Sequence, residues 1–470
     1  MRAFTISILV VIATGSRAEP LTLSDLIERA RKNDHRVKES QAQLSWFRAK
    51  YAEAQWAWFP RVESYVAVAG PTPEARNDGL GGPPRTAASL MYDLDFGQVG
   101  AQFRAGAEAV LPIYTFGKLD ALEAAGAKGV QAGEALAVRA ADEAELQVSQ
   151  AYWGLALARE GAKVIDETMK RLDDARATLE RLRSLDSEQV TQMDVYKLDF
   201  YRQQAEVQRA AAKQGEGFAL AAIRLLIAHP PVEALEVATE ALPEPRGGLD
   251  PIDALLDQAL SHRPELRAVE AGVAAREQEV KLRERMYYPD FGIAGFARWV
   301  WTTSATRQRS PFAYDPYNDL SAGLALVSRY TWDFPQKSAL LDGARAELDK
   351  MRAQRDLVQA AVRLELEKAY GEVSVAQVKF ERQTLAEKSA RRWATAAFAA
   401  FDLGTGDTRD LVESFTALAT ASAQRAQSQH DVQVALRALS RAVGQPVRLQ
   451  VPYDVSPLPP PSAVTAPAAP

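Results

Sequence analysis

The chain has 470 residues, of which 47% are hydrophobic and 25% are charged. This is the composition of a folded protein, and it excludes an intrinsically disordered chain. The formal net charge of −5 argues against nucleic acid as a partner.

The N-terminus predicts an export signal. Arg2 precedes the apolar run from Phe4 to Ala13, and "SRA" ending at Ala18 fits a signal-peptidase site. We therefore expect a signal peptide over 1–18, whose loss takes the net charge of −5 to about −7. The chain has no cysteine, so we expect neither disulfides nor a lipid-anchoring cysteine. After Ala13 no apolar run reaches the ~18–20 residues of a membrane-spanning helix, so a membrane form would cross by strands.

The remaining sequence consists of two similar halves, that is, an internal repeat. Leu26 matches Leu255 at an offset of 229, and "AYW" at 151–153 matches "AYG" at 369–371 at an offset of 218. We expect a first repeat over 19–228, a linker over 229–249, a second repeat over 250–444 and a Pro/Ala-rich tail over 445–470.

Each repeat predicts a helix, two strands and two further helices. In the first repeat these are a helix over 21–58, strands over 61–70 and 98–111 around a Pro/Gly-rich outer loop at 71–97, and helices over 118–183 and 190–228. In the second they are a helix over 250–287, strands over 290–303 and 319–332 around an outer loop at 304–318, and helices over 336–401 and 408–443. The predicted fold is mainly α with a small antiparallel β part, in two tandem helix-strand-strand-helix-helix repeats. The two long helices show a coiled-coil periodicity and would reach about 100 Å.

The strand over 98–111 alternates between two kinds of residue, and only Val110 breaks the pattern. Odd positions such as Phe103 and Leu111 are apolar, whereas Gln102, Arg104 and Glu108 are polar. Four strands of about ten residues suit a tilted transmembrane strand, but four cannot close a barrel, so two, three or four copies would have to combine. On this interpretation Gln102, Arg104 and Glu108 face a wet lumen. A soluble, half-buried sheet would show the same alternation.

Aromatic residues gather near the strand ends of the second repeat. An aromatic girdle of a membrane barrel would lie at this height. The candidates are Trp299, Trp301, Tyr314 and Tyr317.

These features together resemble the TolC-like outer-membrane efflux proteins. The resemblance rests on the doubled plan, on "LTLSDLIERARKNDHRV" and "IDALLDQALSHRPELRAV" before "FP" and "YP", on "PIYTFGK", and on "FDLGTGDTRDLVESFTAL". It covers about residues 20–450. It implies a homotrimer with a 12-stranded barrel in the outer membrane and a helical tunnel in the periplasm. Such a duct serves a tripartite efflux pump or a type I secretion system, with a periplasmic adaptor and an inner-membrane transporter as partners.

The turn after the second long helix is the candidate aperture. Gly404 and Gly406 suit a helix-ending turn, and Asp410 and Glu413 lie three apart on one helix face. The resemblance implies that acidic residues at these two positions ring the periplasmic opening. The alternative is a plain helix start, with Asp407 as cap and Asp410 complementing the dipole.

The corresponding turn of the first repeat departs from the family pattern. Asp186 stands where glycine is common. Asp194 resembles a position that holds a closed tip by polar pairing, with Arg183 or Arg409 as candidate partners, but Thr191 with Asp194 equally fits a helix cap.

We expect no enzyme activity, no cofactor and no metal site. The four histidines are scattered, and no phosphate-binding loop or nucleophile elbow occurs. The main alternative is a soluble periplasmic coiled-coil adaptor or scaffold, and a membrane-bound hydrolase is a weaker one. The sequence leaves the cargo open.

Overall fold

The computed structural model describes residues 20–76, 93–184, 191–231, 233–239, 241–307 and 315–449. These residues form two compact units: the first consists of the described parts of Met1–Ala42, Ala135–Leu266 and Leu357–Pro470, and the second of the described parts of Gln43–Glu134 and Arg267–Asp356. The predicted signal peptide lies outside the described residues, as does the tail from residue 450. No helix in the described part of the chain is both long and apolar enough to span a bilayer.

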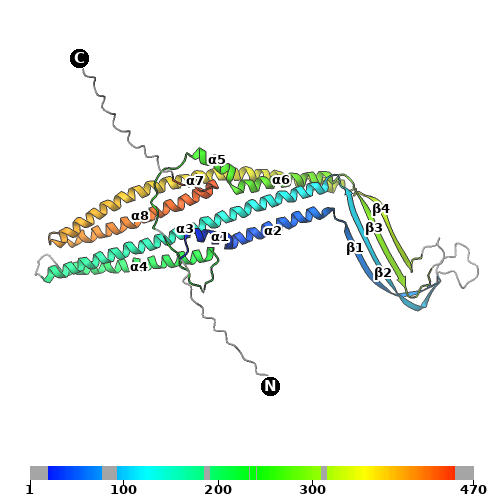
Figure 1. The fold of residues 1–470 in the computed structure, drawn as a ribbon, viewed down its shortest axis with the longest axis horizontal. Coiled ribbons are helices and arrows are strands. Elements are labelled where there is room, and N and C mark those ends of the chain that lie inside the picture. The colour runs from blue at the N-terminus through cyan, green and yellow to red at the C-terminus, as the bar shows by residue number, and fades with distance from the viewer. Residues whose placement is uncertain are drawn as a thin grey trace, which may run out of the picture. The chain divides into compact units, whose positions relative to one another are not determined.

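The expected fold class is confirmed, since the described chain is mostly helical with one small antiparallel sheet (Figure 1). The first repeat contains α1 (Leu23–Asn33), α2 (His35–Gln55), the short 3-10 helix η1 (Trp56–Trp58), β1 (Arg61–Arg76), β2 (Asp93–Tyr114), α3 (Lys118–Ser184) and α4 (Gln192–Leu226). The second contains α5 (Ile252–His262), α6 (Pro264–Arg285), β3 (Asp290–Thr302), β4 (Asp319–Arg329), α7 (Phe334–Asp402) and α8 (Thr408–Val443).

Each of the two helices predicted as single, over 21–58 and 250–287, is interrupted after its first 11 residues. In the second repeat Pro264 begins α6, and a proline there cannot donate to the preceding turn. In the first repeat Asp34 ends α1, and its carboxylate accepts the Arg36 N–H at 2.8 Å, which caps α2. Both breaks therefore have sequence signals that the periodicity alone overlooked.

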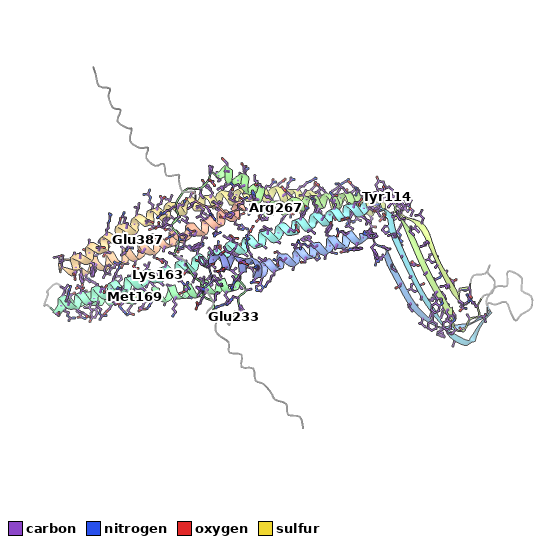
Figure 2. The ribbon with its side chains drawn as sticks, in the orientation of Figure 1. Tyr114, Lys163, Met169, Glu233, Arg267 and Glu387 are labelled. Atoms are coloured by element: carbon purple, nitrogen blue, oxygen red, sulfur yellow. The ribbon has the colours of Figure 1, made fainter. Side chains whose placement is uncertain are left out.

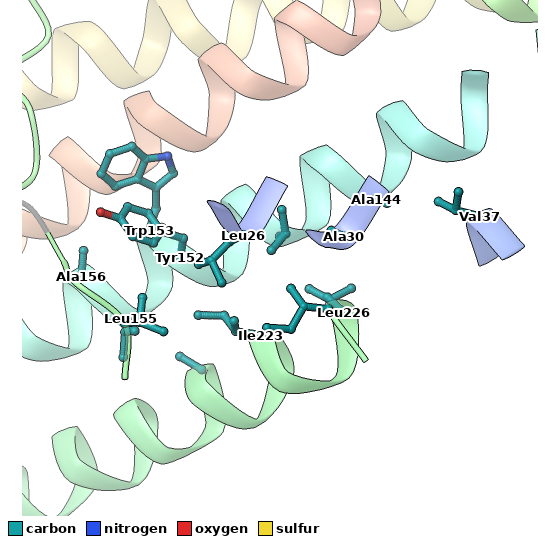
Figure 3. Close-up of a cluster of buried hydrophobic side chains, with 14 residues drawn as sticks. Leu26, Ala30, Val37, Ala144, Tyr152, Trp153, Leu155, Ala156, Ile223 and Leu226 are labelled. Atoms are coloured by element: carbon teal, nitrogen blue, oxygen red, sulfur yellow. The ribbon is translucent and has the colours of Figure 1, made fainter. Parts of the chain in front are cut away.

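Each repeat has its own apolar core in the first unit. Leu26, Val148 and Leu155 are fully buried in the first core, with Tyr152 beside them (Figure 3). Leu255, Leu366 and Val373 occupy the equivalent places in the second core, at the offsets of 229 and 218 seen in the sequence. The internal repeat is thus a repeat of core positions.

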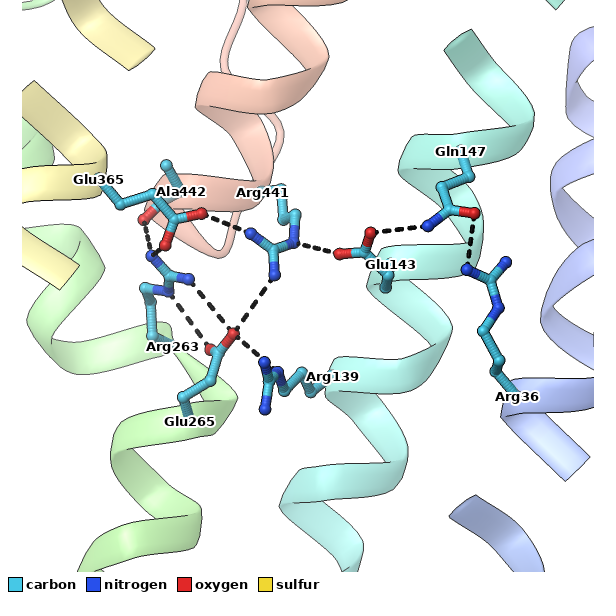
Figure 4. Close-up of polar contacts among 9 residues, drawn as sticks. All are labelled: Arg36, Arg139, Glu143, Gln147, Arg263, Glu265, Glu365, Arg441 and Ala442. Carbon is cyan, nitrogen blue, oxygen red and sulfur yellow. Dashed lines mark hydrogen bonds and ion pairs between the residues drawn. The ribbon is translucent and has the colours of Figure 1, made fainter. Parts of the chain in front are cut away.

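A network of arginines and carboxylates joins the two repeats within the first unit (Figure 4). Arg263, which is 2% exposed, pairs through Nη1 with Glu365 at 2.7 Å and through Nη2 with Glu265 at 3.2 Å. Arg441 of α8 also pairs with Glu365, and it reaches Glu143 of α3 at 2.9 Å. Arg441 therefore ties the second repeat to the long helix of the first.

The centre of this network is a charge-inverted copy of a pair in the first repeat. Asp34 and Arg36, which form an ion pair at 2.7 Å, lie 229 residues before Arg263 and Glu265. The next contact changes its partner, because Arg36 donates to Gln147 at 2.6 Å, whereas Glu365, which follows Gln147 by 218, pairs with Arg263. Equivalent positions thus keep the interaction while the signs are exchanged.

Burial alone would raise the pKa of Glu265, but hydrogen bonding and charge from Arg263 outweigh it, and the pKa of Glu265 lies below its ordinary value. The carboxylate is therefore ionised at neutral pH, and its contribution to stability is lost as the pH falls through the lowered pKa.

Replacement of Arg263 by methionine should strongly destabilise the first unit. The change leaves Glu265 without its buried partner, and breaking a buried pair from one side costs roughly 3–5 kcal/mol; because Glu365 is partly exposed and keeps Arg441, we expect about 3 kcal/mol. The measurement is the thermal unfolding midpoint followed by helical circular dichroism. Arg267→Met, at an exposed position, is the matched control and should leave the midpoint unchanged. Equal midpoints for both variants would contradict the assigned role.

Candidate functional site

The four strands form one antiparallel sheet in the order β1-β2-β3-β4, so each strand pairs with its neighbours in sequence. The register sets Gln102 opposite Ala69 and Thr302, and Phe103 opposite Val68 and Trp301. Because side chains alternate along every strand, this register assigns each residue to one of two faces.

One face of the sheet is apolar and exposed. Along β4, Leu320, Leu324 and Leu326 share this face, and they are 79%, 82% and 76% exposed. Members of this face from the other strands are Val62, Val66, Val68, Phe103, Ala105, Ala107, Leu111, Ile293, Trp299 and Trp301. An apolar surface of this extent marks a contact with lipid or with another protein.

The opposite face is polar. Arg298 pairs with Asp319 at 3.2 Å, and the exposed side chains of Arg104 and Glu108 lie on this face. Gln102 shares the face but is only 4% exposed, since it accepts a hydrogen bond from Arg104 at 2.6 Å and donates one to Thr302. The three polar residues selected from the sequence thus share one face, and only two of them are open to solvent.

Aromatic residues mark both ends of the sheet. Trp299 and Trp301 lie on the apolar face near the end of β3, and Trp301 stacks on Phe103 with ring centroids 5.4 Å apart. Tyr317 lies just before the start of β4 in the sequence. Tyr314 lies outside the described residues. A second group of aromatic residues lies at the opposite end of the sheet from Trp299 and Trp301. We did not predict this group as part of a girdle from the sequence, although the aromatic run "WAWF" indicates it. Its exposed members are Trp56, Trp58, Phe59, Trp332, Phe334 and Tyr114, the last labelled in Figure 2.

The turn between α7 and α8 depends on two glycines. Gly404 has a φ of +73°, a left-handed conformation that other residues rarely adopt. A Cβ on Gly406 would come within 2.7 Å of the Phe401 backbone nitrogen. The N–H groups of both residues donate to carbonyls at the end of α7, at 3.0 and 2.9 Å, which closes the helix.

Helix α8 begins with a cap and then presents two acidic side chains to solvent. Asp407 caps the helix, because its carboxylate accepts the Arg409 N–H at 3.1 Å. Leu411 and Phe415 are buried in the core of the helix tips, which turns Asp410 and Glu413 outward. Among the described residues neither carboxylate has a hydrogen-bond or ion-pair partner.

Asp194 stands in a different environment, at the start of α4. It forms a capping box with Thr191, whose backbone N–H and hydroxyl both donate to Oδ2, at 3.0 and 2.7 Å. Burial opposes the charge, but these hydrogen bonds and Lys197 outweigh it and hold the pKa of Asp194 below its ordinary value. Asp194 therefore takes the cap role that the sequence left open.

Among the described residues neither Arg183 nor Arg409 forms an ion pair with Asp194, which pairs with Lys197 instead. Arg183 donates to Gln192 at 2.8 Å, and Asp186 lies outside the described residues. Sequence reasoning missed a contact between the repeats at the tips, where Arg181 of α3 pairs with Asp402 of α7 at 2.5 Å. Within the described part of the chain, no cluster of histidines and carboxylates is arranged to hold a metal ion.

Replacement of Asp194 by asparagine should loosen the start of α4 by about 1 kcal/mol, the usual worth of an N-terminal cap. Since the folded pKa is lowered, the wild-type advantage is present at neutral pH and disappears as the pH falls through that pKa. Amide hydrogen exchange of the first turn of α4 measures this. Asp410→Asn is the control, because Asp410 caps nothing, and similar exchange in both variants would contradict the assignment.

Comparisons with known proteins agree with this geometry. Residues 255–445 match the family model described as outer membrane efflux protein. Protein CyaE of Bordetella pertussis is 27% identical over 223 residues, and the match covers 46% of each chain, so it spans about half the length of that relative. The outer membrane channel CmeC of Campylobacter jejuni has a TM-score of 0.72 at 12% identity, covering 91% of this chain and 86% of the other. The outer membrane protein VceC of Vibrio cholerae has a TM-score of 0.69 at 15% identity, covering 90% and 96%. At these identities the two structures establish the shared fold.

Proposed function

The chain carries the outer membrane efflux protein domain over residues 255–445 and has the fold of the TolC-like channels, and from this premise we propose that it is the exit duct of a tripartite efflux pump or type I secretion system. It is a passive conduit in the outer membrane, without enzyme activity. The match to the outer membrane efflux protein model and the shared fold with the outer membrane channel CmeC support the same class of function.

The observation that carries the proposal is the two-faced sheet with open edges. Its apolar face is exposed, its other face bears Arg104, Glu108 and the Arg298–Asp319 pair, and within the described residues β1 and β4 each have one unpaired edge. Unpaired backbone edges are too costly in lipid, so the sheet has to close with further copies. Three copies would give a barrel of 12 strands with the apolar face toward lipid and the polar face toward the lumen.

The aromatic residues at both ends of the sheet support this placement. Tryptophan and tyrosine favour the membrane–water interface, where the ring meets the lipid and the polar atom meets water. Trp299 and Trp301 would mark the outer interface, and Trp56, Trp58 and Trp332 the inner one. The helices would then continue into the periplasm.

At the helix tips we propose that Asp410 and Glu413 form the acidic ring of the aperture. Both side chains are exposed and unpaired among the described residues, so their charge is available to the tunnel. Three copies would place six carboxylates around the opening, which attracts cations and hinders anions. A periplasmic adaptor and an inner-membrane transporter would complete the machine and determine the cargo.

The proposed function is tested by negative-stain electron microscopy of the mature protein, extracted from membranes in detergent and averaged without imposed symmetry. We expect hollow threefold cylinders longer than about 100 Å, as helices of 67 and 69 residues require. Thin, solid rods that need no detergent would contradict the proposal and favour a soluble periplasmic adaptor or scaffold.

The acidic ring is tested in planar lipid bilayers. The double variant Asp410→Asn with Glu413→Gln should lose cation selectivity and become insensitive to block by multivalent cations from the periplasmic side, because six charges leave the opening. Glu367→Gln, an exposed change elsewhere on α7, is the control. Unchanged selectivity and block in the double variant would remove the ring hypothesis while leaving the channel intact.

A further inference from the structure

One end of the sheet is joined to the helices, and the other end is not. Strand β2 leads into α3 and β3 follows α6, so Tyr114 and Asp290 lie at the helical end. Thr302 ends β3 and lies opposite Gln102, so this pair lies toward the other end of the sheet. The proposed function places that end at the outer surface of the membrane.

At this end the chain that follows β3 lies over the polar face. A Cβ on Gly100 would lie 2.5 Å from the hydroxyl oxygens of Thr303 and Ser304 and 2.6 Å from the Cβ of Ser304. Directly opposed residues of neighbouring strands keep their Cβ atoms about 4.5–5.5 Å apart. Ser304 therefore lies over Gly100 and not beside it. Because side chains alternate along β2, the covered side of Gly100 is the face that bears Gln102.

Ser304 also reaches a strand that is not a neighbour of β3. Its hydroxyl oxygen lies 3.2 Å from that of Thr72, and it donates to the Thr72 carbonyl at 3.4 Å. Thr72 belongs to β1, and β2 separates β1 from β3. Strands two apart in a sheet are roughly 9.6 Å from each other, which a serine side chain cannot span. The backbone after Thr302 must therefore itself pass over β2.

Further hydrogen bonds fix residues 303–305, which we call the crossing turn. The Thr303 backbone N–H donates to the Ala101 carbonyl at 3.0 Å, and the Thr303 hydroxyl accepts the Ala101 N–H at 2.9 Å. The Ala305 N–H donates back to the Thr302 carbonyl at 3.4 Å, as in a β-turn. Beside the crossing turn, Gln102 and Thr302 are only 4% and 1% exposed, although both lie on the polar face.

We propose that the crossing turn forms a constriction at the outer end of the duct and limits the size of the cargo that leaves it. The inference rests on the proposed function, in which the polar face lines the lumen. Three copies would bring three crossing turns to the same level, each standing inward from the wall. Gly100 makes this possible, because a glycine in a strand lets another backbone approach closely.

Labelling of a lumenal cysteine from outside intact cells tests this inference, because the chain has no cysteine of its own. Glu108→Cys places a thiol at an exposed position of the polar face, nearer the helical end than the crossing turn. A small maleimide added to the medium should label this thiol rapidly. A maleimide carried on a long polyethylene glycol chain should react at least about tenfold more slowly, since pore diameter limits its entry.

Gly100→Val should remove the constriction, because its side chain would occupy the space of Thr303 and Ser304 and force the crossing turn off the polar face. Added to Glu108→Cys, it should raise the labelling rate of the large reagent by about tenfold and leave that of the small reagent unchanged. Gly106→Val is the matched control, on the same strand and face, where its nearest neighbour is the ring of Tyr65. It should change neither rate.

A cysteine pair tests the crossing itself. Thr72→Cys with Ser304→Cys should form an intramolecular disulfide on mild oxidation, since the hydroxyl oxygens that the sulfurs replace lie 3.2 Å apart. Ala69→Cys with Thr302→Cys is the control, because these residues flank Gln102 from strands two apart, too far for a disulfide. The measurement is the number of free thiols in the denatured protein.

The outcomes separate this inference from the proposed function. A large reagent that reacts equally with and without Gly100→Val, whether fast or slow, would overturn the constriction. A Thr72–Ser304 cysteine pair that stays reduced would overturn the crossing. Both results leave the duct standing as long as the small reagent reaches the thiol at position 108 from outside. A thiol that neither reagent reaches would reject the proposed function and the constriction with it.

Discussion

The constraint on which the rest of the structure depends is the open sheet. A meander of four strands with an apolar face and a charged face satisfies its backbone hydrogen bonds internally except along β1 and β4. Water can cover such edges, but lipid cannot, so an apolar face that requires lipid also requires closure. In a bilayer the open edges of β1 and β4 would thus call for a further copy of this chain as their neighbour.

The two repeats are equivalent in their cores but not in their charges. Leu26 and Leu255 hold the same place in successive repeats, whereas Asp34 is replaced by Arg263 and Arg36 by Glu265. Exchanging both signs preserves each pair, so the local fold is maintained. The exchange also gives the second repeat a buried guanidinium that collects Glu265 and Glu365, and Arg441 extends the network to Glu143 of the first repeat. The two repeats therefore share the same core positions, but only the second repeat has a buried arginine at the centre of an ion-pair network.

Local patterns predicted most of the fold, and contacts between distant residues account for what was missed. The alternation from Ala101 to Leu111 identified β2, because the direction of strand side chains depends only on position. The breaks at Asp34 and Arg263 were missed because the apolar period continues through them, although Pro264 was a visible signal. The role of Asp194 stayed ambiguous, because a Thr-x-x-Asp pattern occurs both in a helix cap and where polar pairing would hold a tip closed. The Arg181–Asp402 pair joins residues 221 apart, and no periodicity links them.

The strength of the contacts differs along the first unit, and this difference bears on how an aperture would work. The arginine network buries Arg263 almost completely, and one-sided loss of such a pair is costly. At the tips Arg181 and Asp402 are 57% and 48% exposed, and pairs of that kind contribute only about 0–1 kcal/mol. The tips are held together by the apolar core around Leu179, Phe401 and Leu411, to which the exposed ion pair adds little. In a threefold assembly the carboxylates of Asp410 and Glu413 would repel one another there, so the charge that attracts cations to the opening also favours its widening.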